Sequence, residues 1–362
     1  MEFRGLKAQY KALKKEIDSA VISVLESGQY IGGSEVKELE NELAEYVGVK
    51  HCITCANGTD ALTISLTALG ISKDDIVLVP DFTFFASGES VAFVGATPVF
   101  VDVDENTFNI CSIKIEETII ELKQKGYGDR IKAIMTVDLF GLPANYPEIQ
   151  KIADKYNLLV LEDAAQGFGG SIDGQKSCSF GNIATTSFFP AKPLGCYGDG
   201  GAIFTNDDTL AEFIRSYVVH GKNGNDKYDN IRIGVNSRLD TIQAAILRVK
   251  LQAFINYELD AVNKVAEKYN QDLKEKDYQL PYIPNGYISS FAQYTIKLDS
   301  KEQRDALKNE YEANGIPTMI YYAKPMHQQG AFKGKLIELD CFTGCQDLCD
   351  TVLSLPIGFY IS

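Results

Sequence analysis

The sequence predicts an α/β protein: a large domain with a mostly parallel mixed sheet, then a smaller C-terminal α+β domain. Short apolar runs alternate with helical patterns over the first two thirds of the chain. Such runs are typical of parallel strands covered by helices on both faces. Candidate catalytic side chains stand at or just after predicted strand ends, where ligands bind in such sheets. The 362 residues suffice for about two domains of ~150 residues each. We expect the domains at 1–245 and 246–362.

The predicted elements follow in chain order. The strands expected in the large domain are 76–80, 98–103, 131–138 and 158–163, preceded by a buried strand that ends near Ala56. Helices are expected up to about Val94, where Gly95 ends the pattern, and over 146–156. A long helical pattern over 239–274 leads into the C-terminal domain, where a strand over 291–298 and a helix over 301–314 are expected.

Composition and charge exclude several classes of function. Hydrophobic content of 45% and charged content of 23% are ordinary for a globular protein. The net charge of −14 argues against a general nucleic-acid binder and against docking on an anionic membrane. The first residues lack the apolar core of a signal peptide, and no apolar run is long enough to span a bilayer. We therefore expect a cytoplasmic protein that binds neither nucleic acid nor membrane.

The eight cysteines are interpreted as free thiols in a reducing compartment. Cys52 and Cys55 form a CxxC inside a predicted buried strand, with no second pair nearby to complete a zinc site. Cys341, Cys345 and Cys349 recur every four residues, which would place them on one face of a helix. An iron–sulfur site is the alternative there, but a half-buried helix stripe is favoured, and no metal site is predicted.

A framed lysine is the most informative feature of the chain. Lys192 lies between Pro190 and Pro193, whose fixed φ stiffens the backbone, and a glycine-rich turn follows it. A lysine that forms a Schiff base with an aldehyde needs such placement, because its amine must be positioned and partly desolvated. The alternative is a solvated loop lysine beside a tight turn.

Two further segments suit an anion and a cationic ring. Gly58 turns the chain after a strand, and a helix capped by Thr59 or Asp60 is expected to follow. Free N–H groups at a helix start bind anions, and Ser187 would add a hydroxyl, although a plain strand-turn-helix junction reads the same way. Asp163 ends a buried strand, where an acid is costly without a cationic partner.

Glu162 is the rival of Asp163, but strand alternation sends it to the opposite face. An Asp that caps the next helix is the other reading of Asp163. Phe84 follows another strand end, where its ring would lie against a flat cofactor, unless it is simply a core aromatic. Together, a phosphate cradle, a ring-stacking aromatic, an acid for a ring nitrogen and a lysine for an aldehyde are what pyridoxal 5′-phosphate (PLP) requires.

Four motifs then resemble the DegT/DnrJ/EryC1/StrS sugar aminotransferases over nearly the whole chain. They are Gly58-Thr59-Asp60-Ala61-Leu62, Glu162-Asp163-Ala164-Ala165-Gln166, Ser187-Phe188-Phe189-Pro190-Ala191-Lys192 and Asn236-Ser237-Arg238-Leu239-Asp240. The resemblance implies the aspartate-aminotransferase fold (PLP fold type I) and a homodimer with shared active sites. It implies that Lys192 binds the cofactor aldehyde and that Asp163 pairs with the pyridine nitrogen. The residues implied to hold the phosphate or the ring are Gly58, Thr59, Asp60, Ser187, Phe84, Gln166 and, from the neighbouring subunit, Asn236.

The stretches 187–206 and 220–238 are most similar to family enzymes that aminate C3 of UDP-2-acetamido-2-deoxy-3-keto-glucuronate for bacterial surface polysaccharides such as O-antigen. The resemblance implies glutamate as amino donor and a PLP/PMP (pyridoxamine phosphate) cycle. Arg238 and then Arg232 are candidates to grip an anionic part of the substrate, because a guanidinium matches a carboxylate or phosphate. Either arginine is alternatively an interface salt bridge. Tyr322 and His327 are further substrate-binding candidates.

Alternatives remain open at this point. A dTDP-linked 3-keto-6-deoxyhexose is the second substrate candidate, followed by a 4-keto sugar nucleotide. A PLP-dependent dehydratase is disfavoured, because similar dehydratases carry histidine where this chain has Lys192. A non-catalytic sensor with the same fold has no need for the lysine, the aspartate and the phosphate cradle together.

Overall fold

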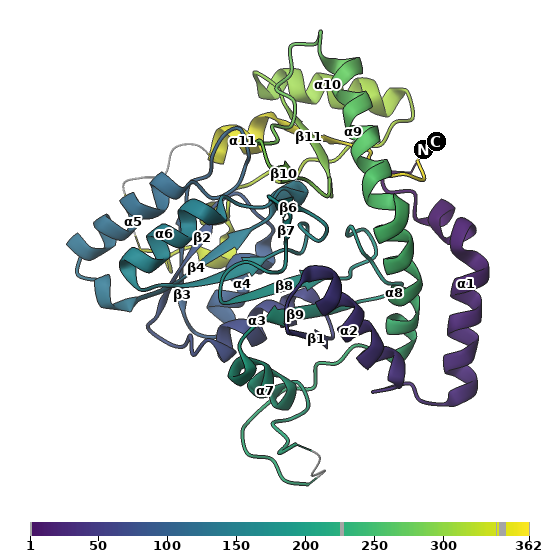
Figure 1. Cartoon of the computed structure of the whole chain (residues 1–362). Coiled ribbons are helices and arrows are strands. Elements are labelled where there is room, and N and C mark those ends of the chain that lie inside the picture. The colour runs from purple at the N-terminus through teal and green to yellow at the C-terminus, as the bar shows by residue number, and fades with distance from the viewer. Residues whose placement is uncertain (1, 225–227, 338, 340–344, 362) are drawn as a thin grey trace.

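The structure is a computed structural model that describes residues 2–224, 228–337, 339 and 345–361. A seven-stranded sheet lies at its centre, in the order β1-β9-β8-β5-β4-β2-β3 (Figure 1). The strands are β1 (His51–Cys55), β2 (Ile76–Pro80), β3 (Thr97–Val101), β4 (Ile131–Val137), β5 (Leu159–Asp163), β8 (Ile183–Ser187) and β9 (Gly201–Thr205). β9 runs antiparallel to both of its neighbours, and the other pairs are parallel.

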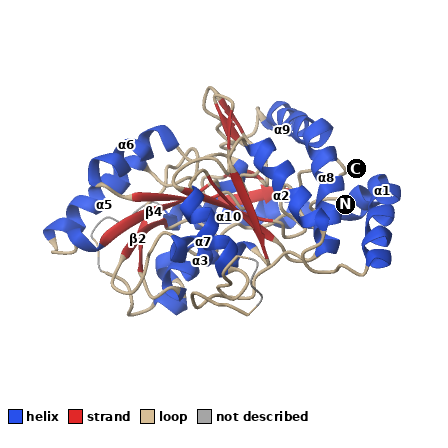
Figure 2. Cartoon of the chain, turned by 60° about the horizontal axis from the view of Figure 1, so that its bottom comes forward, coloured by secondary structure: helices blue, strands red, loops and turns tan. Residues whose placement is uncertain are grey.

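Helices cover both faces of this sheet, and Figure 2 shows the layers edge-on. One face packs against α3 (Gly58–Ala68), α4 (Phe85–Phe93) and α7 (Asp208–Tyr217). The other face packs against α2 (Ser34–Val47), α5 (Ser112–Gln124), α6 (Tyr146–Tyr156) and α8 (Thr241–Ala253), while α1 (Leu6–Ser27) lies along α8. The strands are almost wholly buried, which is why they read as continuous apolar runs.

The C-terminal part forms a smaller unit with its own core. It contains α9 (Leu259–Leu273), α10 (Lys301–Ala313), α11 (Cys345–Thr351) and the antiparallel pair β11 (Tyr294–Lys297) and β12 (Val352–Leu355). A three-stranded ribbon of β10 (Tyr287–Ile288), β6 (Ser171–Ile172) and β7 (Gln175–Lys176) connects it with the large domain. The mixed parallel sheet and the smaller α+β unit confirm the predicted fold class.

The long helix expected over 239–274 is present, but it contains a five-residue π-helical turn, Phe254–Glu258, between α8 and α9. The domain boundary proposed at 245/246 falls inside α8. Leu247 and Leu251, beyond that point, still pack in the core of the large domain, whereas Val262 is the first helix residue in the core of the small one.

Predicted boundaries differ where local backbone geometry intervenes. The strand expected over 291–298 begins only at Tyr294, because Phe291 has a φ of 43°, outside the extended region. The strand expected to reach residue 103 ends at Val101, and Val103 leaves the sheet to pair with Ile110.

All seven cysteines in the described part of the chain are free thiols, and the stripe expected to be half-buried is buried. Cys52 and Cys55 are buried in β1, and Cys345 and Cys349 are buried on one helix, α11; the third member of that stripe, Cys341, lies outside the described residues. Within the described ranges, no group of three or more His, Cys, Asp or Glu side chains is arranged to hold a metal ion. A helix long and apolar enough to cross a membrane is likewise absent from that part of the chain.

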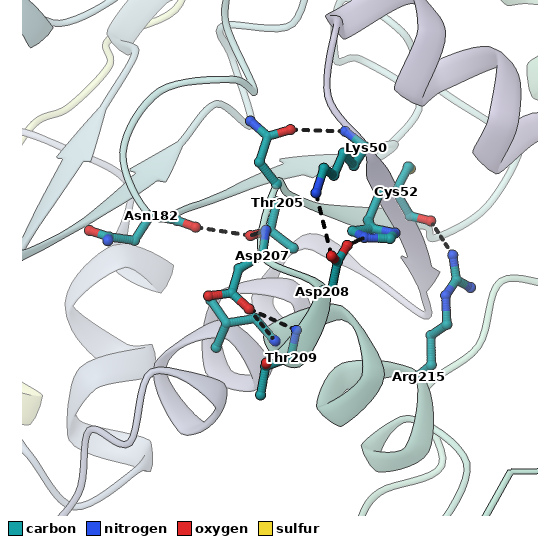
Figure 3. Close-up of polar contacts among 11 residues, drawn as sticks. Lys50, Cys52, Asn182, Thr205, Asp207, Asp208, Thr209 and Arg215 are labelled. Carbon is teal, nitrogen blue, oxygen red and sulfur yellow. Dashed lines mark hydrogen bonds and ion pairs between the residues drawn. The ribbon is translucent and has the colours of Figure 1, made fainter.

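The amino ends of the strands carry structural contacts (Figure 3). The N–H of Lys50 donates to the Asn206 side chain at 2.9 Å, and Nε2 of His51 lies 2.7 Å from Oδ1 of Asp208. Arg215 donates to the carbonyl of Cys52 at 3.0 Å, and Asp207 caps α7. These contacts tie α7 to β1 at the edge of the sheet opposite the polar groups predicted to act on a ligand.

Arg4 ties the start of the chain to the small domain. Its Nη1 donates to the carbonyls of Phe291, Ala292 and Ile357 at 3.4, 3.0 and 3.3 Å. Burial lowers the pKa of the guanidinium to about 10, which leaves it charged at neutral pH. The N-terminal segment is therefore fixed to the small domain.

The packing of α8 gives a test of stability. Leu251 is fully buried, whereas Ile255, one turn later, is 43% exposed. We expect Leu251→Ala to lower the free energy of unfolding by about 3 kcal/mol, because it removes buried methyl groups and leaves a cavity. The matched Ile255→Ala should cost less than about 1 kcal/mol. Urea titration followed by circular dichroism measures both, and equal losses would contradict this placement of α8.

Candidate active site

The predicted site residues meet at one edge of the sheet. β1, β2, β5 and β8 are mutually parallel in direction, so their carboxyl ends lie together. Asp163 ends β5 and Ser187 ends β8, with Lys192 in the loop that follows. The β1–α3 turn brings Gly58 against Ser187.

Asp163 is almost completely buried, at 5% exposure. Oδ2 accepts a hydrogen bond from the Ser87 hydroxyl at 2.9 Å, and Oδ1 accepts one from the Ala165 N–H at 3.2 Å. Burial raises the pKa of Asp163, while these two bonds and the charge of Lys192 oppose that rise. A carboxylate held in this way is suited to face a protonated ring nitrogen.

Glu162 points to the opposite face, as strand alternation predicted. Its carboxylate accepts hydrogen bonds from the N–H groups of Cys178 at 2.6 Å and Phe180 at 2.8 Å. Glu162 therefore holds the backbone on the other face of the sheet, and Asp163 is the strand-end acid whose charge interacts with Lys192.

Lys192 is half-buried, and its backbone N–H donates to the carbonyl of Phe189 at 2.9 Å. Burial lowers the pKa of its ammonium; Asp163 opposes this shift, and the positive charge of Arg4 adds to it. A lowered pKa increases the neutral fraction of the amine, the form that attacks an aldehyde or accepts a proton. The solvated loop lysine considered from the sequence does not fit these surroundings.

The turn and helix start predicted to form a phosphate cradle are present, with a different helix cap. Asn57 caps α3, and its side chain accepts from the Asp60 N–H at 2.8 Å, whereas Thr59 or Asp60 was expected as cap. The N–H groups of Gly58 and Thr59 precede this bond at the open end of the helix. A Cβ at Gly58 would lie 2.6 Å from Cβ of Ser187, so only glycine lets the helix start and the hydroxyl approach so closely. This cradle fits the phosphate of PLP.

Asp60 acts through its carboxylate on a second segment. Oδ2 accepts from the Ser237 hydroxyl at 2.5 Å, and that hydroxyl accepts from the Ala56 N–H at 3.0 Å. Asn236 is exposed beside Ser237, and Arg238 is half-buried. The segment that contains Asn236 and Arg238 is thus anchored beside the cradle, and their predicted roles stay predictions.

Gln166, Tyr322 and Phe84 form an aromatic and amide wall beside the candidate site. Gln166 is buried: Oε1 accepts from the Phe140 N–H at 2.9 Å, and Nε2 donates to the Tyr322 hydroxyl at 3.1 Å. The ring of Tyr322 lies 6.2 Å from that of Phe84, measured between centroids. Phe84 is 54% exposed, so it is not the core aromatic of the alternative interpretation.

Two substrate-binding candidates have partners of another kind. The guanidinium of Arg232 lies over the Phe213 ring, 4.9 Å from its centroid, on α7. Nδ1 of His327 lies 2.6 Å from Oδ2 of the buried Asp81. These contacts join Arg232 to Phe213 and His327 to Asp81, and neither involves Lys192. The roles of both residues toward a substrate remain predictions.

Several residues that build the site escaped sequence reasoning. Ser87 stands three residues after Phe84, on the first turn of α4, and only the structure shows that it is buried. Asn57 is a strong cap residue directly before Gly58. Asp81, at the end of β2, follows the same strand-end rule that found Asp163.

The fold and this site define a PLP fold type I enzyme, in which a strand-end acid faces a lysine beside a phosphate cradle. The chain belongs to the DegT/DnrJ/EryC1/StrS aminotransferase family, whose model matches residues 11–361. It is therefore an aminotransferase, and the predictions of fold class, family and enzyme class are confirmed.

Two curated relatives are similar over almost their whole length. The chain is 45% identical over 361 residues to UDP-2-acetamido-2-deoxy-3-oxo-D-glucuronate aminotransferase of Pseudomonas aeruginosa, with 100% of this chain and 96% of the relative covered. It is 39% identical to dTDP-3-amino-3,6-dideoxy-α-D-galactopyranose transaminase of Aneurinibacillus thermoaerophilus, with 99% and 93% covered.

Solved structures agree in fold. A DegT/DnrJ/EryC1/StrS aminotransferase from Brucella abortus superposes with a TM-score of 0.95 at 46% identity, over 100% of this chain and 95% of that one. A Bacillus subtilis protein, NtdA, solved with bound PMP, superposes with a TM-score of 0.88 at 28% identity, over 99% and 81%. The expectation of a PLP/PMP cofactor is in keeping with this second structure.

The cradle can be tested without any reaction. We expect Gly58→Ala to weaken PLP binding by about tenfold or more, because the added methyl group displaces Ser187. Gly330→Ala is the matched control, since a Cβ there meets nothing within 4 Å. Equilibrium dialysis with PLP measures the affinity, and thermal unfolding without cofactor checks the fold. Equal PLP affinity in the two variants would show that Gly58 does not shape the phosphate site.

Proposed function

We propose that the chain transfers the amino group of glutamate to a nucleotide-linked keto sugar, with C3 of UDP-2-acetamido-2-deoxy-3-keto-glucuronate as the preferred acceptor. The observation that carries the proposal is the gathering of the buried Asp163, the Gly58–Ser187 cradle and the loop of Lys192 at the carboxyl ends of neighbouring strands, where the charges of Asp163 and Lys192 interact. The choice of sugar is supported by the 45% identity to the P. aeruginosa relative that bears this activity in its name. A dTDP-linked 3-keto-6-deoxyhexose is the second candidate, supported by the 39% identical transaminase.

The cofactor in this proposal is PLP. The Gly58–Ser187 cradle would hold its phosphate, Phe84 and Gln166 would lie against its ring, and Asp163 would accept the hydrogen bond of its ring nitrogen. When bound, PLP supplies an aldehyde that exchanges amines and a ring that withdraws electrons from the reacting carbon. Asp163 would stabilise a proton on that ring nitrogen, because its burial would strengthen the charge pair.

Lys192 is the proton carrier in this proposal. With PLP bound, Nζ of Lys192 would accept the proton from the α-carbon of glutamate. In the second half of the cycle the same atom delivers a proton to C3 of the sugar. The lowered pKa of Lys192 favours the neutral amine that the first of these transfers needs. Arg238 is proposed to hold an anionic group of the sugar nucleotide.

Removing the amine tests the assignment. We expect Lys192→Ala to abolish amination, measured as 2-oxoglutarate formed from glutamate in the presence of the UDP-keto-uronate. Lys50→Ala, at the opposite edge of the sheet, should stay within about twofold of the parent. Visible absorbance gives a second readout: the parent protein with PLP should be yellow and should lose that colour with glutamate. Substantial turnover by Lys192→Ala would refute the assignment.

The sugar is tested by comparing acceptors. The expected result is the highest kcat/KM on the UDP-keto-uronate, with the dTDP-linked 3-keto-6-deoxyhexose and 4-keto sugar nucleotides lower by about tenfold or more. A preference for the dTDP sugar would make the second candidate the proposed substrate.

We further propose that the protein takes part in making bacterial surface polysaccharides such as O-antigen, and that it acts in the cytoplasm.

We also propose a homodimer whose subunits complete each other's sites, with Asn236 contributed by the neighbouring subunit. Support comes from large apolar side chains exposed together on α1 and in the turn after it: Ile22, Leu25, Tyr30 and Ile31 are each about half exposed. Loop residues Ile231 and Ile233, close to Asn236, are exposed as well.

A charge on α1 tests this surface. We expect Leu25→Asp to shift the protein from dimer toward monomer, because the carboxylate would be buried without a partner. Ile113→Asp is the control, because Ile113 is exposed and belongs to α5, which lies on the opposite side of the molecule from α1 in Figure 1. Sedimentation velocity measures both. A dimer unchanged by Leu25→Asp would place the interface elsewhere.

A further inference from the structure

Two separate segments supply the aromatic wall of the site. Phe82 and Phe84 stand in the turn between β2 and α4, and Tyr322 belongs to a segment some 240 residues later in the chain. The ring of Tyr322 lies 6.1 Å from Phe82 and 6.2 Å from Phe84, between centroids. Ring contacts of this length make a modest contribution, so they do not fix the position of the later segment by themselves. Something else must fix how the two segments meet.

Asp81 makes three polar contacts with the later segment. Its carbonyl accepts from the Met326 N–H at 2.8 Å, and Oδ1 accepts from the His327 N–H at 2.8 Å. Oδ2 lies 2.6 Å from Nδ1 of the His327 ring. Both backbone and side chain of one residue therefore hold both backbone and side chain of the other segment.

Burial makes this connection strong and directional. The side chain of Asp81 is 1% exposed, so a carboxylate there depends on its hydrogen bonds. Met326 is also buried, and a Cβ on Gly88 of α4 would lie 2.7 Å from its terminal methyl group. The later segment is thus locked to the β2–α4 turn four or five residues after Tyr322. Because only four or five residues separate these contacts from Tyr322, a shift of the later segment at Asp81 would also move the tyrosine ring.

We propose that Asp81, through its pair with His327, is a positioning residue that holds Tyr322 against Gln166 and Phe84 and so shapes the sugar side of the site. The proposal rests on the proposed function, since it concerns the same site. It assigns His327 a task different from the direct substrate contact expected from the sequence, because Nδ1 and the backbone N–H of His327 are both directed to Asp81.

The consequence is a difference between the two half-reactions. Glutamate is small and reacts next to Lys192 and Asp163, whereas a nucleotide sugar must also fit against the wall at Tyr322. A misplaced wall therefore penalises the sugar and spares glutamate. A pair that merely stabilises the fold would affect both half-reactions alike.

The experiment uses full-length protein with PLP. We expect Asp81→Asn to lower kcat/KM for the keto sugar nucleotide by about tenfold or more, mainly through KM, and to leave single-turnover bleaching by glutamate within about twofold. Adding Tyr322→Phe to Asp81→Asn should cost less than an additional twofold or so, because one change acts through the other.

His51 and Asp208 provide a control of the same chemistry. This pair is joined at 2.7 Å at the opposite edge of the sheet (Figure 3), and Asp208→Asn should leave both half-reactions unchanged. If Asp81→Asn does not fold, judged by its melting temperature, His327→Gln takes its place, because it removes the ring and keeps the backbone bond.

Unchanged sugar kinetics, equal losses in both half-reactions, or full additivity with Tyr322→Phe would each overturn the inference. Its failure is distinguishable from failure of the proposed function. A parent protein that neither bleaches with glutamate nor aminates any keto sugar would sink the function itself. If the parent protein aminates a keto sugar and Asp81→Asn leaves the kinetics with that sugar unchanged, only the positioning role is contradicted.

Discussion

A carboxylate withdrawn from water opposite an amine is the interaction on which the rest of the site depends. Asp163 is buried at the end of β5, where an unpaired negative charge would be costly. Lys192 lowers that cost, and the same burial shifts the lysine toward its neutral form. Lys192 thus favours the ionised form of Asp163, whereas the neutral form of Lys192 is favoured by burial and opposed by Asp163. The Ser87 and Ala165 hydrogen bonds keep the carboxylate oriented.

The sheet makes that meeting possible. Parallel strands deliver their polar ends to one edge, while the opposite edge carries the ion pairs and caps that bind α7 to β1. Along the strands, the groups proposed to act on a ligand therefore lie at one end and the groups that stabilise the fold lie at the other. Alternation separates them again across the sheet: Asp163 faces the site, and the adjacent Glu162 holds the backbone of Cys178 and Phe180 behind it.

Sequence reasoning succeeded where a local rule determines the outcome. Burial of the strands makes them continuous apolar runs, and a two-residue period separates Asp163 from Glu162. Reasoning failed where several residues compete for one position: Asn57, Thr59 and Asp60 are all good caps, and only the actual helix start selects Asn57. It also failed for contacts between distant segments. Nothing near Asp81 in the sequence indicates His327, and nothing near Arg232 indicates that it lies over Phe213.

The hydrogen bonds of Arg4 to the small domain bear on the order in which the protein folds during biosynthesis. Its guanidinium is synthesised well before the carbonyls of Phe291, Ala292 and Ile357, from which it is separated by 287, 288 and 353 residues. Contacts that span nearly the whole chain are slow to form, because a large loop must close first. We therefore expect the central sheet to form during synthesis before Arg4 makes these hydrogen bonds, so that the small domain packs against a large domain that has already folded.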